Sequence, residues 1–320
     1  MRRSSHLPHV SVHLCSPLHH HMRRQLTLRH KSILVVFLGI PTVLARVLYE
    51  DSPYTEMPDP IACHSHNDYW RDEPLFSALK TGCIGIEADV WLVEDDLWIA
   101  HEEQDLKRGM TFSSLYVDPL VELLEKRNTF SPVDGWTTLG VYESDPKQTV
   151  VLVIDLKSES HDTWPVVHAQ LQPLRERGWL SHVSDGQVHH LPITIVGSGT
   201  TDFETLMANT TYRDAFFDAP LNALEGSEYD ATNSYYASVS FTKHLGHSLT
   251  GYLSSSQLGK LRRAVDEAHS RGLKARYWGS PAWALNVRGR VWKTLSDEGV
   301  DLVNVDDLQS FRDWTLRKTE

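Results

Sequence analysis

The chain has 320 residues, 41% of them hydrophobic, and a formal net charge of −11 at pH 7. An apolar fraction of this size supports a folded domain with a substantial core. The acidic balance argues against a nucleic-acid-binding protein, which needs positive charge to displace counterions from phosphates.

Residues 1–50 predict a targeting leader, because no acidic residue precedes Glu50 and Arg and Lys are frequent there. The apolar run 32–45 is short for a bilayer-spanning helix, which needs about 20 residues. It has the length and basic flank of a signal-peptide core. We therefore expect a secreted or endomembrane protein with a signal peptide or anchor, with a mitochondrial presequence as the alternative. The glycosylation sequon at Asn209 fits secretion.

From about residue 55 onward, short β-like runs alternate with helical patterns. Continuous apolar runs such as 150–154 and 193–196 are typical of buried parallel strands. Apolar residues spaced by 3 or 4 predict helices over 164–177, 257–271 and 289–298. Strands are predicted at 60–63, 84–91, 97–100, 150–155, 193–197, 235–239, 273–278 and 301–304.

This order predicts an α/β protein whose residues 51–320 form a single (β/α)8 TIM barrel, because eight strands are joined mostly by helices. The second connection is too short for a helix. It is predicted as a hairpin-like turn around Glu94-Asp95-Asp96.

The cysteines are expected to be free thiols. If the first two strands are parallel, Cys63 lies at the carboxyl end of one and Cys83 at the amino end of the next. At the usual strand rise this separates them by about 13 Å, which is beyond the reach of a disulfide.

Ionisable side chains fall at or near the carboxyl ends of successive predicted strands: His64, Glu87, Asp89, His101 and Asp155. In such barrels this end carries the active site. Residues two apart in a strand share a face, so Glu87 and Asp89 point the same way. Three carboxylates facing one axis would repel one another without a cation, and oxygen ligands suit Mg²⁺ or Ca²⁺ better than zinc. The two histidines could serve as acid and base.

Four segments in this order carry a family resemblance: IACH with Asn67, then GIEADV, IAH and VIDLK. They resemble the PLC-like phosphodiesterase superfamily, which includes glycerophosphodiester phosphodiesterases and sphingomyelinase D enzymes. The wording CHSHNDYW, ADVWL and SLYVDPL is similar to the fungal altered-inheritance-of-mitochondria group. The resemblance covers essentially the whole body, including the closing GVDLVNVDDLQ.

The resemblance implies a phosphoric diester hydrolase acting on a glycerophosphodiester or (lyso)phospholipid. Its implied metal ligands are Glu87, Asp89 and Asp155, which would hold one Mg²⁺ or Ca²⁺. Its implied catalytic residues are His64 and His101, as acid–base or nucleophile pair, and Lys157, which would stabilise charge on the phosphate. An internal attack that leaves a cyclic phosphate is the alternative outcome. The chain departs from the glycerophosphodiesterase pattern at Ser65 and Glu102.

Other residues have two interpretations each. Asn67 could orient its loop or bind the phosphate, and Arg276 and Trp278 could clamp a substrate or pack at the barrel top. His66 is expected to hydrogen-bond within its loop rather than act in catalysis, and Asp306-Asp307 to cap a helix. A rim of tryptophans could contact a membrane surface or be half-buried: Trp70, Trp91, Trp98 and Trp283.

A different class of function is a catalytically silent barrel that binds phospholipid head groups or acts as a membrane-associated scaffold. Two features motivate this alternative: Glu102 after His101 departs from the glycerophosphodiesterase pattern, and the amino terminus is basic and apolar. The sequence predicts no nucleic-acid partner and identifies no protein partner.

Overall fold

The computed structural model describes residues 57–282 and 284–319, all within one compact unit, Ser52–Glu320. The expected leader 1–50 and Trp283 lie outside the described residues, so the domain division at residue 50 stays a prediction. Within the described ranges, no helix is both long and apolar enough to cross a membrane.

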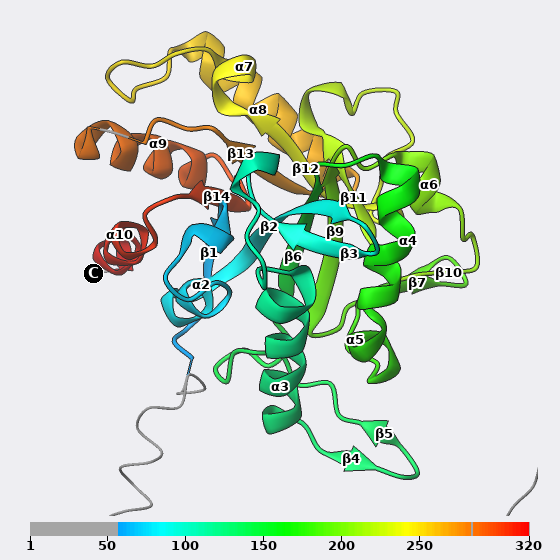
Figure 1. Ribbon diagram of the computed structural model, residues 1–320. Coiled ribbons are helices and arrows are strands. Elements are labelled where there is room, and N and C mark those ends of the chain that lie inside the picture. Colours follow the sequence, from blue (N-terminus) through cyan, green and yellow to red (C-terminus); the bar gives the residue numbers. More distant parts are fainter. Residues whose placement is uncertain (1–56, 283, 320) are drawn as a thin grey trace, which may run out of the picture. The chain divides into compact units, whose positions relative to one another are not determined.

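Eight parallel strands of the described region close into a barrel (Figure 1), which confirms the predicted TIM-barrel fold. The ring closes because β1 (Ile61–Ser65) pairs with both β2 (Cys83–Val93) and β14 (Leu302–Val305). The strands between them are β6 (Val150–Leu156), β9 (Ile193–Gly199), β11 (Phe216–Pro220), β12 (Ser234–Ser240) and β13 (Lys274–Trp278).

The predicted hairpin is confirmed, but the strand after it is not a barrel strand. β3 (Asp96–Ile99) runs antiparallel to β2, with Val93 opposite Asp96, and so lies outside the closed ring. The eighth barrel strand is instead β11, which the sequence interpretation missed. It has only five residues, and it contains Asp218 and ends in Pro220, two residue types that strands disfavour.

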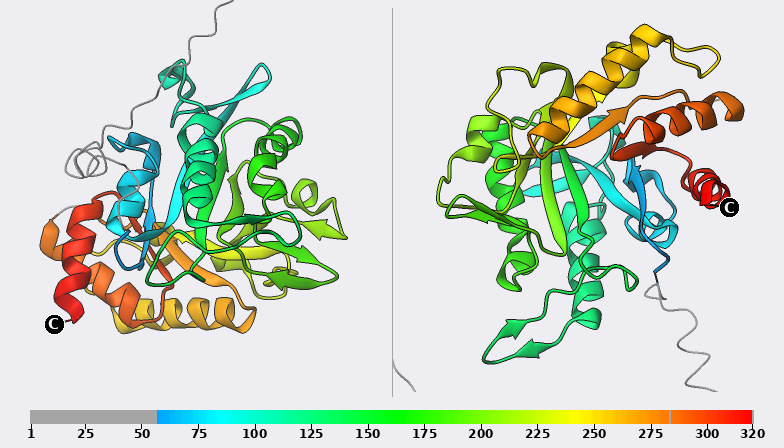
Figure 2. Two further views of the ribbon diagram at one scale, coloured as in Figure 1. Left: turned by 90° about the horizontal axis from the view of Figure 1, so that it is seen from below. Right: turned by 180° about the vertical axis from the view of Figure 1, so that it is seen from behind.

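Helices lie around the outside of the strands (Figures 1 and 2). The predicted helix 164–177 is interrupted at Leu171, while 257–271 and 289–298 lie within or close to single helices. The α-helices are α2 (Phe76–Thr81), α3 (Asp118–Arg127), α4 (Ser160–Gln170), α5 (Gln172–Glu176), α6 (Phe203–Met207), α7 (Phe241–Leu245), α8 (Ser255–Ser270), α9 (Leu285–Asp297) and α10 (Leu308–Thr319).

Shorter elements connect these layers. Single helical turns span Asp68–Trp70, Glu103–Asp105, Ser113–Val117 and Leu221–Ala223. Two small antiparallel sheets lie apart from the barrel ring: β4 (Phe130–Ser131) with β5 (Gly135–Trp136), and β10 (Tyr212–Arg213), β7 (His182–Ser184) and β8 (Gln187–His189).

Strand β6 shows how the barrel separates its core from its site. Val150, Leu152 and Ile154 pack outward among the helices. Val151 and Val153 belong to a separate apolar cluster with side chains of the other strands. Because side chains alternate along a strand, Asp155 continues the inward row above those valines. The interior of the barrel is therefore filled by apolar side chains, and its polar side chains lie above them at the carboxyl ends of the strands.

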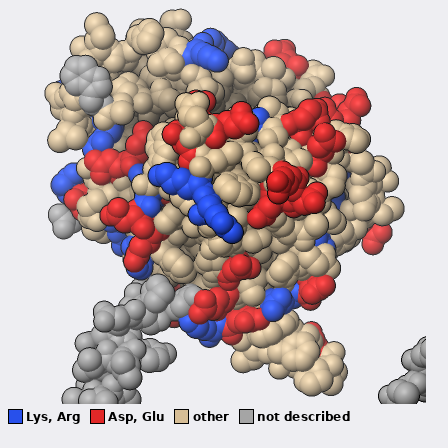
Figure 3. Space-filling model, in the orientation of Figure 1, with Lys and Arg blue, Asp and Glu red and all other residues tan. Residues whose placement is uncertain are grey.

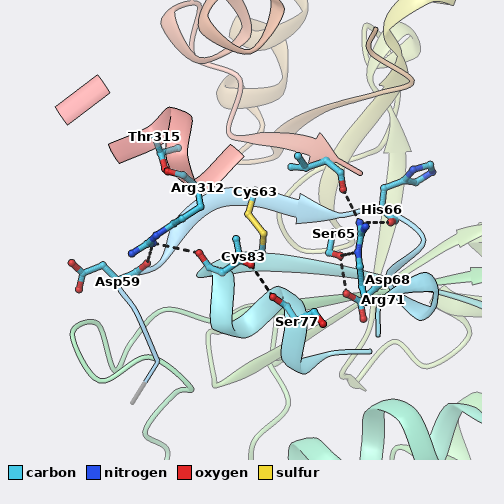
Figure 4. The surroundings of a disulfide bond; sticks show 12 residues. Asp59, Cys63, Ser65, His66, Asp68, Arg71, Ser77, Cys83, Arg312 and Thr315 are labelled. Atoms are coloured by element: carbon cyan, nitrogen blue, oxygen red, sulfur yellow. Dashed lines mark hydrogen bonds between the residues drawn. A yellow bond between two sulfur atoms is a disulfide. The ribbon is translucent and has the colours of Figure 1, made fainter. Parts of the chain in front are cut away.

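The expectation of free thiols is wrong, because Cys63 and Cys83 form a disulfide with Cα atoms 4.8 Å apart (Figure 4). The predicted first strand ended at Cys63, whereas β1 continues to Ser65. Its pairing with β2 places Ile61 opposite Cys83, and an irregularity precedes the next pair, His64 opposite Gly85. Cys63 therefore lies beside the start of β2.

Candidate active site

A pocket of about 440 Å³ opens at the carboxyl ends of the barrel strands. It is lined by His66, Asn67, Glu87, His101, Asp155, Lys157, Ser198, Gly199, Phe217, Asp218, Pro220, Ser238, Arg276 and Trp278. The residues that the sequence singled out thus meet in one place, apart from His64 and Asp89, which are fully buried.

The three predicted metal ligands come from neighbouring strands. Glu87 and Asp89 share a face of β2, and Asp89 lies directly opposite Asp155 of β6. Ser198 Oγ of β9 donates to Asp155 Oδ2 at 2.9 Å. Gly199 has a φ of +69°, and a Cβ there would lie 2.6 Å from Asp155 Oδ1, so glycine leaves space for this carboxylate.

Two cationic side chains reach these carboxylates. Lys157 Nζ lies 2.9 Å from Asp89 Oδ2 and 2.8 Å from Asp155 Oδ1. Burial alone would lower the pKa of Lys157, but the two aspartates raise it to about 12. Arg276 is 4% exposed and lies 3.4 Å from both Glu87 and Asp218. These cations stay charged at neutral pH.

Negative charge nevertheless exceeds positive charge, because Glu87, Asp89, Asp155 and Asp218 face only two cations. Burial, and then repulsion from Glu87, raises the pKa of Asp89. Burial raises the pKa of Asp218, although Arg276 opposes this shift. One oxygen of each aspartate, Oδ1, is buried without a hydrogen-bond partner. On the face shown in Figure 3, acidic side chains likewise cover more of the surface than basic ones.

The donor set fits a divalent cation in charge and in chemistry, since Mg²⁺ and Ca²⁺ prefer carboxylate oxygens and Asp89 offers an unpartnered one. Among the described residues, no three His, Cys, Asp or Glu side chains are already grouped around a metal position. The Lys157 ammonium bridges two of the three predicted ligands instead. A bound cation and this ammonium would compete for the same oxygens.

His101 follows β3, so the hairpin outside the barrel carries this side chain to the pocket. Its Nδ1 lies 3.0 Å from Asp89 Oδ2, and its ring packs edge-on against Trp70. The Tyr69 hydroxyl donates to the same Asp89 oxygen at 2.8 Å. The imidazole is 42% exposed, which leaves it accessible to a substrate.

His64 lies beneath the pocket. It is fully buried, with Nε2 3.2 Å from Glu87 Oε2 and Nδ1 without a partner. A Cβ on Gly85 would lie 2.4 Å from this ring, so glycine is needed behind it. Burial, followed by the charge of Arg276, lowers the pKa of His64 to about 4. The predicted acid–base role of His64 remains a prediction, and this position favours orientation of Glu87 instead.

His66 faces the pocket instead, on the loop after β1. Its Nδ1 lies 2.7 Å from Asp306 Oδ1, so the expectation that His66 hydrogen-bonds within its own loop is wrong. This hydrogen bond raises the pKa of His66 against the effect of burial. Arg71 fixes the loop by donating to the His66 carbonyl at 3.0 Å (Figure 4). It also donates to the Asp306 carbonyl. The predicted helix cap is confirmed for Asp307, which accepts from the Ser310 amide, but Asp306 pairs with His66.

Asn67 adopts a left-handed conformation, with φ of 47°, and its Oδ1 lies 2.9 Å from the Tyr69 hydroxyl oxygen, close enough to share the proton that Tyr69 donates to Asp89. It therefore orients the loop while it also lines the pocket. Trp278 is 38% exposed at the end of β13 and forms part of the opposite wall. Of the predicted tryptophan rim, Trp70 is 63% exposed, and Trp91 and Trp98 are half-buried.

Three polar residues of the site were missed from sequence. Asp218 was missed together with its strand β11. Ser198 and Ser238 orient Asp155 and Arg276 by hydrogen bonds of 2.9 Å. A serine near a strand end gives no specific signal, so only Asp218 could have been found, by a search for an acidic residue in a short apolar run.

Comparison with known proteins identifies the family. Residues 54–218 match the model of the AIM6-like phosphodiesterase domain. The chain belongs to this family. It is 38% identical to the altered inheritance of mitochondria protein 6 homolog of Arthroderma benhamiae, over 78% of this chain and 82% of that protein. It is 35% identical to the altered inheritance of mitochondria protein 6 of Eremothecium gossypii, over 77% of this chain and 67% of that protein. It is 32% identical to the protein of the same name from Saccharomyces cerevisiae, over 78% of this chain and 70% of that protein.

The family match extends from the residues before β1 to Asp218 in β11. It therefore includes the carboxylates, Lys157, His66 and His101, whereas Arg276 and Asp306 lie beyond it. No solved structure gave a significant match to the chain.

Proposed function

We propose that the protein is a metal-dependent phosphoric diester hydrolase whose substrate is a glycerophosphodiester or a lysophospholipid. The observation that carries the proposal is the pocket in which Lys157, Arg276 and two accessible histidines surround a group of carboxylates. Membership of a phosphodiesterase family supports it.

Glu87, Asp89 and Asp155 would hold one Mg²⁺ or Ca²⁺, with Asp218 adding negative charge nearby. When bound, such an ion withdraws charge from phosphorus through a non-bridging oxygen. Lys157 and Arg276 supply the remaining positive charge for the phosphate, and charged hydrogen bonds of this kind are the strong ones in proteins. Asn67 and Trp278 border the space left for the alcohol groups.

His66 and His101 are the proposed acid–base pair, because both line the pocket and each is oriented by an aspartate. The water oxygen bonds to phosphorus while its proton passes to one imidazole. The bond from phosphorus to the leaving oxygen breaks, and the other imidazole protonates that oxygen. The products are an alcohol and a phosphomonoester. His64 acts through Glu87 as a positioning residue.

The test is hydrolysis of bis(p-nitrophenyl) phosphate, glycerophosphocholine and lysophosphatidylcholine with Mg²⁺, with Ca²⁺ and with EDTA. Glu87→Gln and His101→Ala are expected to lower kcat by at least about 100-fold, the usual range for acid–base and electrostatic contributions. His161→Ala, at an exposed histidine on α4, is the control. Activity that survives chelation and both substitutions would exclude this mechanism. ³¹P NMR of the products separates hydrolysis from cyclisation.

A second candidate is a catalytically silent barrel that binds phospholipid head groups or acts as a membrane-associated scaffold. The ion pairs of Lys157 with Asp89 and Asp155 favour it, because they neutralise the predicted metal ligands without a metal. Exposed Trp70 would offer a membrane contact. Titration with Mg²⁺ and Ca²⁺, together with liposome flotation, decides between the two. Tight metal binding without flotation supports the enzyme.

We further propose an oxidising compartment for the folded chain, because disulfides such as Cys63–Cys83 persist in secreted and endomembrane proteins. The names of the relatives, which refer to mitochondrial inheritance, are compatible with the mitochondrial alternative. Fractionation of cells that express the tagged full chain, with a test for glycosylation at Asn209, distinguishes these destinations.

A further inference from the structure

A second pocket of about 380 Å³ adjoins the candidate active site. The two pockets share Ser238 of β12 and Trp278 at the end of β13, so they lie side by side. The second pocket reaches outward to α7 and α8, which are neighbours in the fold (Figure 1). A substrate bound at Arg276 could therefore extend into it.

The charge of this second pocket is opposite to that of the chain. Its ionisable lining residues are Lys243, His244 and Lys260, and its lining contains no Asp or Glu. Burial, and then the nearby Lys260, lowers the pKa of His244 to about 4, so the lysines carry the charge at neutral pH.

Neither lysine is neutralised within the described part of the chain. Lys260 Nζ donates to the His244 carbonyl at 2.6 Å, and Lys243 Nζ lies 5.9 Å from the ring centroid of Trp278. Neither ammonium forms an ion pair with a carboxylate in these described ranges, whereas Lys157 and Arg276 in the first pocket both do. Because its two lysines lack carboxylate partners in the described part of the chain, the second pocket can bind an anionic group of a ligand.

We infer that the second pocket is a subsite for an additional anionic group, a phosphomonoester or carboxylate, on the alcohol of the phosphodiester substrate. The inference rests on the proposed hydrolysis and narrows the substrate class to phosphodiesters with a second negative group. Trp278 lies between the scissile phosphate and that group, where its ring packs against the alcohol.

The test compares two substrates that differ only in this group: bis(glycero)phosphate and the same diester with a terminal phosphomonoester. Lys243→Ala/Lys260→Ala in the full chain should lower kcat/KM for the doubly anionic substrate about tenfold, mainly by raising KM. The effect is modest because the ion pair of each exposed lysine with the second anionic group of the substrate is weak. The singly charged substrate should be unaffected. Lys147→Ala, which removes one lysine charge before β6 at the other end of the barrel, is the control for a general effect of lost positive charge.

The charge-retaining variant Lys243→Arg/Lys260→Arg should keep the preference for the doubly anionic substrate. If the alanine variant loses kcat/KM equally for both substrates, or for neither, the subsite is refuted. If neither substrate is cleaved by the wild-type chain, the proposed hydrolysis fails. Calorimetric titration with inorganic phosphate in EDTA, where no divalent cation draws phosphate to the first pocket, then decides the subsite by itself. About tenfold weaker phosphate binding in the alanine variant supports it, and unchanged binding refutes it.

Discussion

Substitution of Arg276 by methionine tests the electrostatics of the candidate site. The guanidinium is 4% exposed and is shared by Glu87 and Asp218, while its Nε donates to Ser238 at 2.9 Å. Removing one partner of a buried ion pair typically costs about 3–5 kcal/mol, because the other charge stays buried without compensation. For a domain of this size we expect the melting temperature to fall by roughly 10 °C.

The loss should depend on pH. Against the effect of burial, the hydrogen bond from His64 and the charge of Arg276 hold the pKa of Glu87 well below its usual value. A lowered folded-state pKa contributes stability that is complete above the unfolded pKa and disappears as pH falls through the folded one. The difference between wild type and variant should therefore be full at pH 7 and shrink below about pH 4.5.

Thermal and urea unfolding of wild type and Arg276→Met between pH 3 and pH 8 measure this difference. Arg262→Met is the matched control, because Arg262 forms a bidentate pair with Glu298 on the surface and its loss should change stability little. An equal loss in both variants, or a loss for Arg276→Met that does not change with pH, would refute the reasoning.

Three further substitutions test separate parts of the site. Lys157→Met should bind Mg²⁺ or Ca²⁺ at least as tightly as wild type by calorimetry, since the ammonium competes for the same oxygens; weaker binding would place Lys157 in a supporting role. Cys63→Ser should lower the free energy of unfolding by about 3 kcal/mol, the value for a closed loop near 20 residues. If reduction of the wild-type protein left its stability unchanged, that result would contradict the disulfide. Asp306→Asn should move the pH–rate limb governed by His66 to lower pH, because Asp306 raises the pKa of that imidazole; an unmoved limb would assign it elsewhere.

Hydrophobic pattern was sufficient for the fold class and for the carboxylates Glu87, Asp89 and Asp155. Runs such as 150–154 can only be buried on both sides, and the alternation in β2 aims Glu87 and Asp89 together. The pattern could not show which strands close the ring. β3 has a strand-like sequence but pairs antiparallel with β2, whereas β11 is short and ends in proline.

The two neighbouring histidines show a second limit, which arises from strand ends. In a continuous strand, His64 and His66 would share one face. β1 ends at Ser65, so His64 points into the barrel, while the His66 amide donates to the Val305 carbonyl and its ring turns to Asp306. The partner that defines His66 lies 240 residues away. Sequence spacing alone contains no information about that pairing.

The balance of charge at the barrel mouth determines what the proposed binding of a phosphodiester would require. Four carboxylates with two cations repel an anionic substrate; burial, followed by repulsion from Glu87, also raises the pKa of Asp89. A divalent cation on Glu87, Asp89 and Asp155 would cancel the excess and free the Lys157 ammonium for the phosphate. On this reasoning metal and substrate bind with positive coupling, so phosphate affinity should rise with Mg²⁺ concentration. Phosphate binding that is indifferent to Mg²⁺ would mean that the ion pairs of Lys157 persist in the active protein.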